Sequence, residues 1–343
     1  MNQPSEPLSN ISNASVADKR SQLAFVFRGD GMEYFKIWIV NILLTIITLG
    51  IYSAWATVRN NRYFYSNLYL DNDNFRYLAE PLAILKSRII AIVAFIIYYI
   101  VSMTSPTIWM FLNIALVLAI PYFINQSLAF NNRMSSYKNI QFRFKGSYGQ
   151  AFMVIYIWPL LALLTLGILF PLAMLKSNEY FVRNSAYGTS NFDFNATYKD
   201  YAMILLTAIG IGLVVAVPFA LLAYFIPAMS AISAIIYMLA YFGLFVYLMS
   251  SNANLFYASL SLKEHKFTSN FTVMGMSKVL LINFLLTLIT LGLYLPAAKV
   301  RMAKYICSCV IMNADGPLDN FSAAEQENIS ALGEEFGQVF DFA

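Results

Sequence analysis

The chain contains, near its start, the segment Asn41-Ile-Leu-Leu-Thr-Ile-Ile-Thr-Leu-Gly-Ile-Tyr52 and, near its end, the segment Asn283-Phe-Leu-Leu-Thr-Leu-Ile-Thr-Leu-Gly-Leu-Tyr294. Nine of the twelve positions are identical, and the three differences exchange one apolar residue for another. A weaker copy lies between them and includes Thr165-Leu-Gly167, with Trp158 in place of the asparagine. Self-similarity of this kind indicates that one structural unit is repeated along the chain.

The composition around these segments is that of a membrane protein. Of the 343 residues, 59% are hydrophobic and only 12% are charged, about half the charged share of an ordinary globular protein. Two soluble domains of this total length would expose more surface than so few charges could keep in solution. The sequence therefore excludes a soluble enzyme and favours a multi-pass membrane protein.

Long stretches without any charged residue predict the membrane spans. A helix needs roughly 20 apolar residues to cross a bilayer. The stretches between Arg88 and Arg133 and between Asp200 and Lys263 are each long enough for two such helices. Four spanning helices are therefore expected near residues 87–104, 107–125, 202–225 and 229–250.

The charges of the connecting loops predict the topology, because Lys and Arg collect on the cytoplasmic side of short loops. The turns near 102–107 and 226–230 carry no base, whereas the loop 126–150 carries four bases and no acid. Both termini are then cytoplasmic, and each Thr-Leu-Gly segment has cytoplasmic residues at both of its ends. We therefore expect three re-entrant hairpins; the alternative is seven full spans.

A reversal at Thr-Leu-Gly is chemically reasonable, because glycine adopts unusual backbone angles and proline suits the first turn of a new helix. The asparagines and threonines around it lie on one helical face. They could bind ions or carboxylates at the broken helix, or they could only hydrogen-bond neighbouring helices. The residues assigned to this motif are Asn41, Thr45, Thr48, Gly50, Thr165, Gly167, Pro171, Asn283, Thr287, Thr290, Gly292 and Pro296.

The predicted fold is an all-α membrane bundle with three repeated Thr-Leu-Gly segments. Short cytoplasmic β segments are expected at alternating runs such as Phe25-Val-Phe27-Arg-Gly29. The predicted divisions are a disordered cytoplasmic tail at 1–24, repeat 1 at 25–141, repeat 2 at 142–264, a partial repeat 3 at 265–312, and an acidic amphipathic tail at 313–343.

Basic residues flank the apolar stretches, and their expected partner is the bilayer, including its anionic lipids. The acidic C-terminal tail has a helical apolar spacing over Ser330–Phe340, so we expect it to dock on the chain's own basic face or on an unknown protein. The residues assigned to the basic fringe are Arg59, Arg62, Arg88, Arg133, Arg143, Lys145, Lys176 and Arg301.

Three motifs together resemble the bacterial YjgN-type inner-membrane family, a domain of unknown function. They are Phe-x-Phe-x-Gly before a helix, Thr48-Leu-Gly-Ile-Tyr-x-x-Trp55, and Arg62-Tyr63-x-x-x-Asn67 followed by Phe75. The resemblance covers roughly residues 25–343 and implies a multi-pass inner-membrane protein. It implies no activity, because the family has no established catalytic or binding residues.

No catalytic or metal-binding pattern stands out. His265 is the only histidine and is interpreted as an ordinary loop residue; Cys307 and Cys309 lack the spacing of a redox or zinc motif. The charge-free stretches hold none of the acids on which proton-coupled carriers depend. We therefore expect no enzyme, no cofactor, no metal and no nucleic-acid partner.

Two classes of function remain open at this stage. The first is a pore, carrier or lipid-binding protein built around the three broken-helix repeats. The second is a structural or regulatory scaffold that presents a cytoplasmic surface to a partner. The sequence does not settle the oligomeric state.

Overall fold

The structure, a computed structural model, describes residues 20–315, and its centre is an antiparallel sheet of eleven strands. The strand order is β1-β11-β10-β9-β8-β7-β6-β5-β4-β3-β2. The strands are β1 (Arg20–Ala24), β2 (Val26–Phe27), β3 (Leu68–Leu70), β4 (Asp73–Tyr77), β5 (Ser135–Tyr137), β6 (Ile140–Phe144), β7 (Ser185–Tyr187), β8 (Ser190–Phe194), β9 (Leu260–Leu262), β10 (His265–Ser269) and β11 (Val310–Asp315).

The sheet nearly closes into a barrel, because its two outermost strands are consecutive in the chain. Only Phe25 separates β1 from β2. Strand β1 pairs with β11, from Arg20↔Asp315 to Ala24↔Ile311, while β2 pairs with β3. The prediction of an all-α fold with short β segments is therefore wrong, since the short strands join into one sheet that connects both ends of the described chain.

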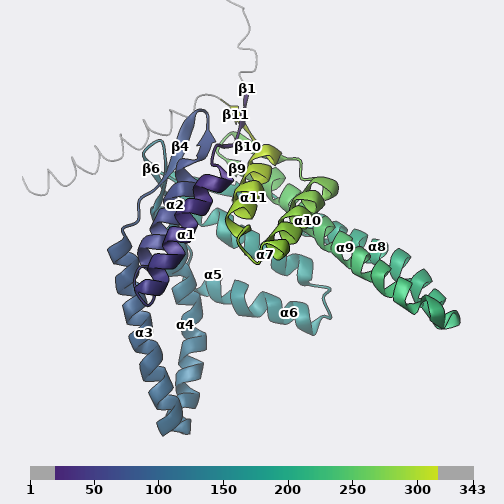
Figure 1. Cartoon of the computed structure of the whole chain (residues 1–343), viewed down its shortest axis with the longest axis horizontal. Helices are drawn as coiled ribbons and strands as arrows, with labels where there is room; N and C mark the ends of the chain where they lie inside the picture. Colours follow the sequence, from purple (N-terminus) through teal and green to yellow (C-terminus); the bar gives the residue numbers. More distant parts are fainter. Residues whose placement is uncertain (1–19, 316–343) are drawn as a thin grey trace, which may run out of the picture.

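Tight turns make most of these strands into hairpins. Asp71-Asn72 and Lys138-Asn139 both have positive φ at each residue, between 45° and 62°. Two-residue turns of this kind match the right-handed twist of the paired strands, and asparagine tolerates the left-handed backbone well. Each of these β-hairpins follows a helix in the chain, so helices and β-hairpins alternate along the sequence (Figure 1).

Four of the described helices are long and apolar enough to cross a membrane by length and composition. They overlap the four predicted spans, and at most 11% of the residues in the most apolar window of each are buried. The pair α3–α4 and the pair α8–α9 leave the barrel in different directions (Figure 1). These helices are α3 (Pro81–Thr104), α4 (Pro106–Arg133), α8 (Tyr198–Phe225) and α9 (Ser230–Ser259), and the short 3-10 turn η2 (Pro227–Met229) precedes α9.

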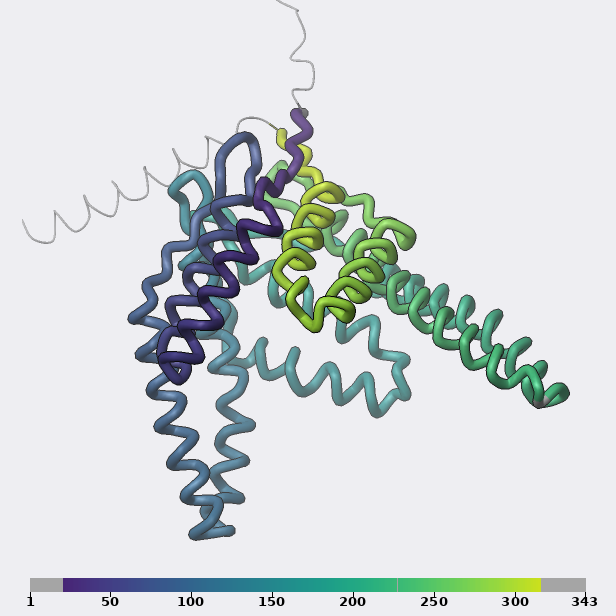
Figure 2. The backbone as a smooth tube through the Cα atoms, viewed as in Figure 1, coloured from purple at the N-terminus to yellow at the C-terminus, as the bar shows by residue number. Residues whose placement is uncertain are grey.

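Each Thr-Leu-Gly segment is two helices joined by a sharp reversal, which the backbone trace shows clearly (Figure 2). We call them hairpin 1 (31–66), hairpin 2 (148–183) and hairpin 3 (273–309). The first arm of hairpin 2 is interrupted by a π-helix. Their elements are α1 (Gly31–Ile47) and α2 (Ser53–Ser66); α5 (Tyr148–Phe152), η1 (Met153–Ile157), α6 (Trp158–Leu164) and α7 (Phe170–Arg183); and α10 (Val273–Ile289) and α11 (Leu295–Cys309).

The ends of the chain are more ordered than the sequence indicates. Arg20–Ala24, assigned to the N-terminal tail, forms β1, and the first residues of the acidic tail belong to β11. His265 is not a loop residue: it begins β10, is buried, and its Nδ1 accepts a hydrogen bond from the Asp315 amide at 3.0 Å. The helix predicted over Ser330–Phe340 and its docking lie outside the described residues.

Candidate functional site

The three hairpins share one turn geometry. The leucine of each turn adopts a left-handed conformation, and the following glycine has φ of 91° or 92°. Glycine reaches this φ without steric cost, whereas other residues rarely do. The residues concerned are Leu49 (φ 48°), Leu166 (φ 52°) and Leu291 (φ 49°), followed by Gly50, Gly167 and Gly292.

The threonine of each turn joins the two arms. The Thr48 hydroxyl donates to the Leu44 carbonyl at 2.7 Å and accepts a hydrogen bond from the Tyr52 amide at 2.9 Å. Thr165 and Thr290 make the same two contacts in hairpins 2 and 3. The hydroxyl therefore satisfies a backbone amide that the break in the helix would otherwise leave without a partner.

The asparagines hold the arms of hairpins 1 and 3 together. Asn41 is buried, and its Nδ2 donates to Asn60 Oδ1 at 2.9 Å. Asn283 Nδ2 donates to the Ala298 carbonyl at 3.1 Å. Hydrogen bonds of this kind between helices are common in membrane proteins.

The remaining motif residues also have contacts within the hairpins. Thr45 Oγ1 donates to the Asn41 carbonyl at 2.6 Å, and the Thr287 carbonyl accepts from the Gly292 amide at 2.8 Å. Pro171 and Pro296 are buried in the first turns of the returning helices α7 and α11.

The tips of the hairpins are apolar and almost fully exposed. Leu49, Leu166 and Leu291 are 95%, 95% and 93% exposed. Large exposed apolar residues flank each of them, for example Ile47 beside Leu49 and Ile289 beside Leu291. Concentrated apolar surface of this kind marks a contact with a membrane or a partner.

The uncharged first arms of hairpins 1 and 3 are shorter than the hydrocarbon core of a bilayer is thick. Eleven residues separate Lys36 from Thr48 in hairpin 1, and eleven separate Lys278 from Thr290 in hairpin 3. At a rise of 1.5 Å per residue, the uncharged part of each first arm is about 16 Å long. The hydrocarbon core is about 30 Å thick, so such an arm reaches about one leaflet.

Arg88 places the tip of hairpin 1 relative to the spanning helix α3. Its guanidinium donates to the hydroxyls of Ser53 and Thr57, the latter at 2.8 Å, at the start of α2. Thr104, at the far end of α3, is sixteen residues beyond Arg88, or about 24 Å along the helix. The tip of hairpin 1 is therefore close to the barrel-side end of α3.

The other residues of the predicted basic fringe come from four helices, from the end of strand β6 and from the residue that follows it. Arg62 donates to the Ala79 carbonyl at 3.1 Å, and Lys176 forms an ion pair with Glu179 at 2.7 Å. The Arg301 guanidinium lies 5.4 Å from the centre of the Tyr294 ring. The exposed members are Arg59, Arg62, Arg133, Arg143 and Lys145.

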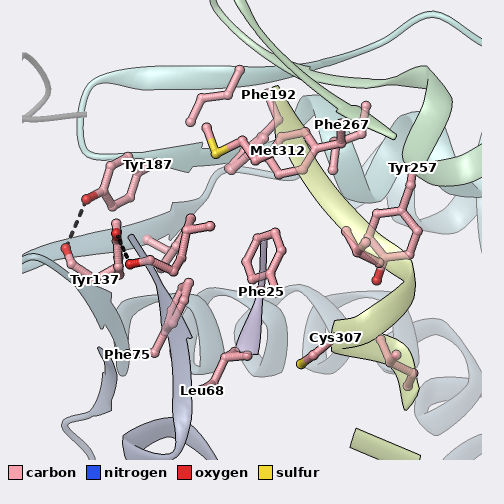
Figure 3. A pocket seen from close by; sticks show the side chains of 16 residues that line it. Phe25, Leu68, Phe75, Tyr137, Tyr187, Phe192, Tyr257, Phe267, Cys307 and Met312 are labelled. Carbon is pink, nitrogen blue, oxygen red and sulfur yellow. Dashed lines mark hydrogen bonds between the residues drawn. The ribbon is translucent and has the colours of Figure 1, made fainter. Parts of the chain in front are cut away.

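The interior of the barrel contains an apolar cavity that the sequence did not predict (Figure 3). Its volume is about 350 Å³. Five phenylalanines line it, and neighbouring rings are 6.4–6.5 Å apart with interplanar angles of 12–28°. Four of them lie on every second strand of the barrel, from β4 to β10, and the fifth lies between β1 and β2. They are Phe75, Phe142, Phe192, Phe267 and Phe25.

The strands between them contribute a second layer to the same wall, formed by Leu70, Tyr137, Tyr187, Leu262 and Met312. A local signal for the phenylalanine layer, though not for the second layer, is present in the sequence, because four of the five phenylalanines are followed two residues later by a second aromatic residue. Such alternation places one side chain inside a barrel and the next outside.

The polar groups in the cavity wall are few and uncharged. The Tyr137 hydroxyl donates to the Leu70 carbonyl at 2.7 Å, and the Tyr187 hydroxyl donates to the Tyr137 carbonyl at 2.9 Å. Burial raises the pKa of the Cys307 thiol to about 11, so this thiol is neutral near pH 7. None of the lining residues is charged.

Comparison with known proteins identifies relatives in bacterial inner membranes. The sequence profile of a family described as bacterial protein of unknown function (DUF898) matches residues 22–339. An inner membrane protein YjgN of Salmonella typhimurium is 28% identical, over 88% of this chain and 91% of the relative. A YjgN of Escherichia coli O157:H7 is 31% identical over 46% of this chain and 40% of the relative. No solved structure matches significantly.

Proposed function

This chain belongs to the DUF898 family of bacterial proteins of unknown function, and we propose that it is a lipid-binding protein of the inner membrane. In this proposal, three repeated hairpins insert their tips into the leaflet next to the barrel, while four helices cross the bilayer. The relatives support the location, because those reported above are inner membrane proteins. The proposed function involves no enzymatic activity.

The observation that carries the proposal is the set of three exposed tips. Each turn presents a leucine that is more than nine-tenths exposed, on a backbone stabilised by its own threonine and glycine. An apolar side chain that a well-ordered turn holds away from the rest of the protein is unfavourable in water. Such a turn is stabilised by an apolar environment outside the protein. The acyl chains of one leaflet supply that environment at the depth that the arms of hairpins 1 and 3, about 16 Å long, can reach.

The charges suggest which leaflet this is. Exposed bases lie at the barrel-side ends of the helices and on the barrel, including Arg133, Arg143 and Lys145. The turn between α3 and α4 carries no base. By the positive-inside rule the barrel is cytoplasmic, and so are both termini. The exposed bases then contact the headgroups of anionic lipids.

The hydrogen bonds within the hairpins favour lipid binding over a pore or carrier. A transport path along the motif residues would need polar groups that are free to bind a solute. Thr48, Thr165 and Thr290 use their hydroxyls within their own turns, and Asn41 and Asn283 each direct their amide nitrogen to the opposite arm. The threonine hydroxyls and the amide nitrogens are therefore used within the hairpins. The amide oxygens of Asn41 and Asn283 have no hydrogen-bond partner among residues 20–315, but they are buried and so are not accessible to a solute.

The test measures the depth of each tip in a bilayer. Single cysteines at Leu49, Leu166 and Leu291, in a Cys307→Ala/Cys309→Ala background, are labelled with an environment-sensitive fluorophore after reconstitution into phosphatidylcholine vesicles containing phosphatidylglycerol. Quenching by spin labels at known positions on the acyl chains reports the depth. The matched control is a cysteine at Asn139, which is exposed in a barrel turn.

We expect all three tips to be quenched by lipid-borne spin labels in one leaflet, and the Asn139 position to be quenched by aqueous iodide only. Tips that respond to iodide as Asn139 does would contradict the proposal. They would favour the alternative, a scaffold whose hairpins contact a cytoplasmic partner.

A further inference from the structure

The barrel cavity is too large to be a packing defect. Well-packed protein interiors contain few voids larger than one water molecule. An apolar cavity of roughly 150 Å³ is enough to bind benzene, and pockets for small molecules start at roughly 300 Å³. At about 350 Å³, the barrel interior has the size of a site for a small molecule.

The wall of the cavity excludes charged molecules. Phenylalanine, leucine and tyrosine side chains dominate it, and none of the lining residues is charged. An ionised group placed there would lose its hydration without gaining an opposite charge, which is strongly unfavourable. The occupant must therefore be neutral and mostly apolar.

One hydroxyl in the wall remains available. Figure 3 shows the hydroxyls of Tyr137 and Tyr187 occupied on one side of the cavity, and Tyr257 on the other side near Cys307. The Tyr257 hydroxyl, at the barrel end of α9, makes no hydrogen bond to another group within residues 20–315. A tyrosine hydroxyl in an apolar site normally has a partner, so a ligand oxygen would complete this one.

We propose that the barrel interior binds a small uncharged apolar molecule with a single hydrogen-bonding oxygen, and that Tyr257 bonds that oxygen. The five phenylalanines, together with Leu70, Leu262 and Met312, surround the hydrocarbon part of that molecule. The bilayer is the source of such a molecule, because neutral apolar compounds partition into the hydrocarbon that surrounds the four long helices. This inference concerns a different part of the molecule from the hairpin tips.

The probe for the test is octanol carrying a photoreactive diazirine. The detergent-solubilised full chain is irradiated with the probe, and the labelled peptides are identified by mass spectrometry. We expect labelling of strand peptides that line the barrel. Leu262→Trp fills the cavity and should reduce that labelling more than tenfold, whereas Lys266→Trp, at an exposed position on the adjacent strand β10, should leave it unchanged.

Competition experiments test the role of Tyr257 and do not depend on the folding of Leu262→Trp. Unlabelled octanol should compete about three- to tenfold less well against the probe in Tyr257→Phe, which is the loss expected for one hydrogen bond. Octane should compete equally in both proteins, and octanoate should compete poorly. Labelling confined to membrane helices and hairpins, or octanol competition unchanged in Tyr257→Phe, would overturn the proposal.

Discussion

Hairpins 1 and 3 differ from hairpin 2 in their arms but not in their turns. In hairpins 1 and 3 the first arm is one continuous helix with an asparagine that bonds across to the second arm. Helix α1 of hairpin 1 also packs against α11 of hairpin 3. In hairpin 2, Trp158 and Pro159 follow a π-helical turn, and the second arm packs against α8.

A tyrosine in the second arm of each hairpin also has different partners in hairpin 2 than in hairpins 1 and 3. Tyr63 and Tyr305 donate to backbone carbonyls at the starts of their own hairpins, those of Asp30 and Thr272. The equivalent Tyr180 hydroxyl donates instead to Asn125 on the spanning helix α4. The turn is therefore specified by three local residues, whereas the course of the arms depends on the neighbours that each hairpin contacts.

If each turn is specified only by its own three residues, the same substitution should have the same effect on stability in all three hairpins. Gly50→Val, Gly167→Val and Gly292→Val each place a β-branched residue at φ near 92°, which should destabilise the protein by up to about 3 kcal/mol. Denaturant titration of the detergent-solubilised variants measures the loss. A loss in hairpin 2 that differs from the other two by more than about 1 kcal/mol would show that its turn depends on its surroundings.

The reactivity of thiols should separate the buried Cys307, in the second arm of hairpin 3, from a cysteine at the half-buried position 177, in the second arm of hairpin 2. Because burial raises the pKa of Cys307 to about 11, its thiolate fraction at pH 8 is about 100-fold below that of an ordinary thiol. Iodoacetamide should therefore modify Cys307 about 100-fold more slowly than a cysteine at Ser177, which lines a groove between α7 and α8.

The sign of the pH effect is a further check on that prediction. Only the thiolate reacts, so the rate at Cys307 should rise about tenfold per pH unit between pH 8 and 10. Each protein carries a single cysteine, with the native thiols otherwise replaced by alanine. Equal rates for Cys307 and the Ser177→Cys variant at pH 8 would contradict the burial of the Cys307 thiol.

The contact between hairpins 1 and 3 can be disturbed at one glycine. A Cβ at Gly31 would lie 3.2 Å from the Cβ of Ala297, whereas a Cβ at Gly149 of hairpin 2 would meet nothing within 4 Å. Gly31→Leu should therefore cost about 2 kcal/mol through overpacking. Gly149→Leu should cost nothing, because leucine has the better helix propensity. Equal unfolding free energies for the two variants would contradict the close packing of Gly31 against Ala297.

The smallest effect is expected for the hydrogen bond between the arms of hairpin 1. Asn60→Leu leaves the Asn41 amide without its acceptor, and Asn41→Leu/Asn60→Leu removes both partners. The double-mutant cycle should give a coupling energy of about 1 kcal/mol. No coupling in the unfolding free energies would mean that the asparagine does not stabilise the hairpin.

The long helices and the breaks at Thr-Leu-Gly could be predicted because their signals are local. Charge-free stretches delimit the helices, and glycine and proline mark the reversals. The barrel could not be predicted, since strands such as Ser135–Tyr137 have only three residues and show no alternation that can be detected. Its closure depends on pairing Arg20 with Asp315, a contact between opposite ends of the sequence.

The candidate sites also differ in whether their residues are close together or far apart in the sequence. The motif residues of the hairpins are close in sequence, so their assembly could be expected. The cavity instead collects one phenylalanine from each of five distant segments, among them Phe25, Phe142 and Phe267. The sequence pattern singled out the first two as members of a strand but gave no reason to place them around one cavity.

The central claim is that every hairpin returns to the side of the membrane from which it enters, so that all strands of the barrel lie in the cytoplasm. Single cysteines at Thr104, Leu49, Leu166, Leu291 and Asn139, in the Cys307→Ala/Cys309→Ala background, are treated in intact cells with a maleimide that cannot cross the inner membrane. We predict labelling at Thr104 alone, and labelling at Asn139 only after the inner membrane is permeabilised. Labelling of any hairpin tip, or of Asn139, in intact cells would contradict the account.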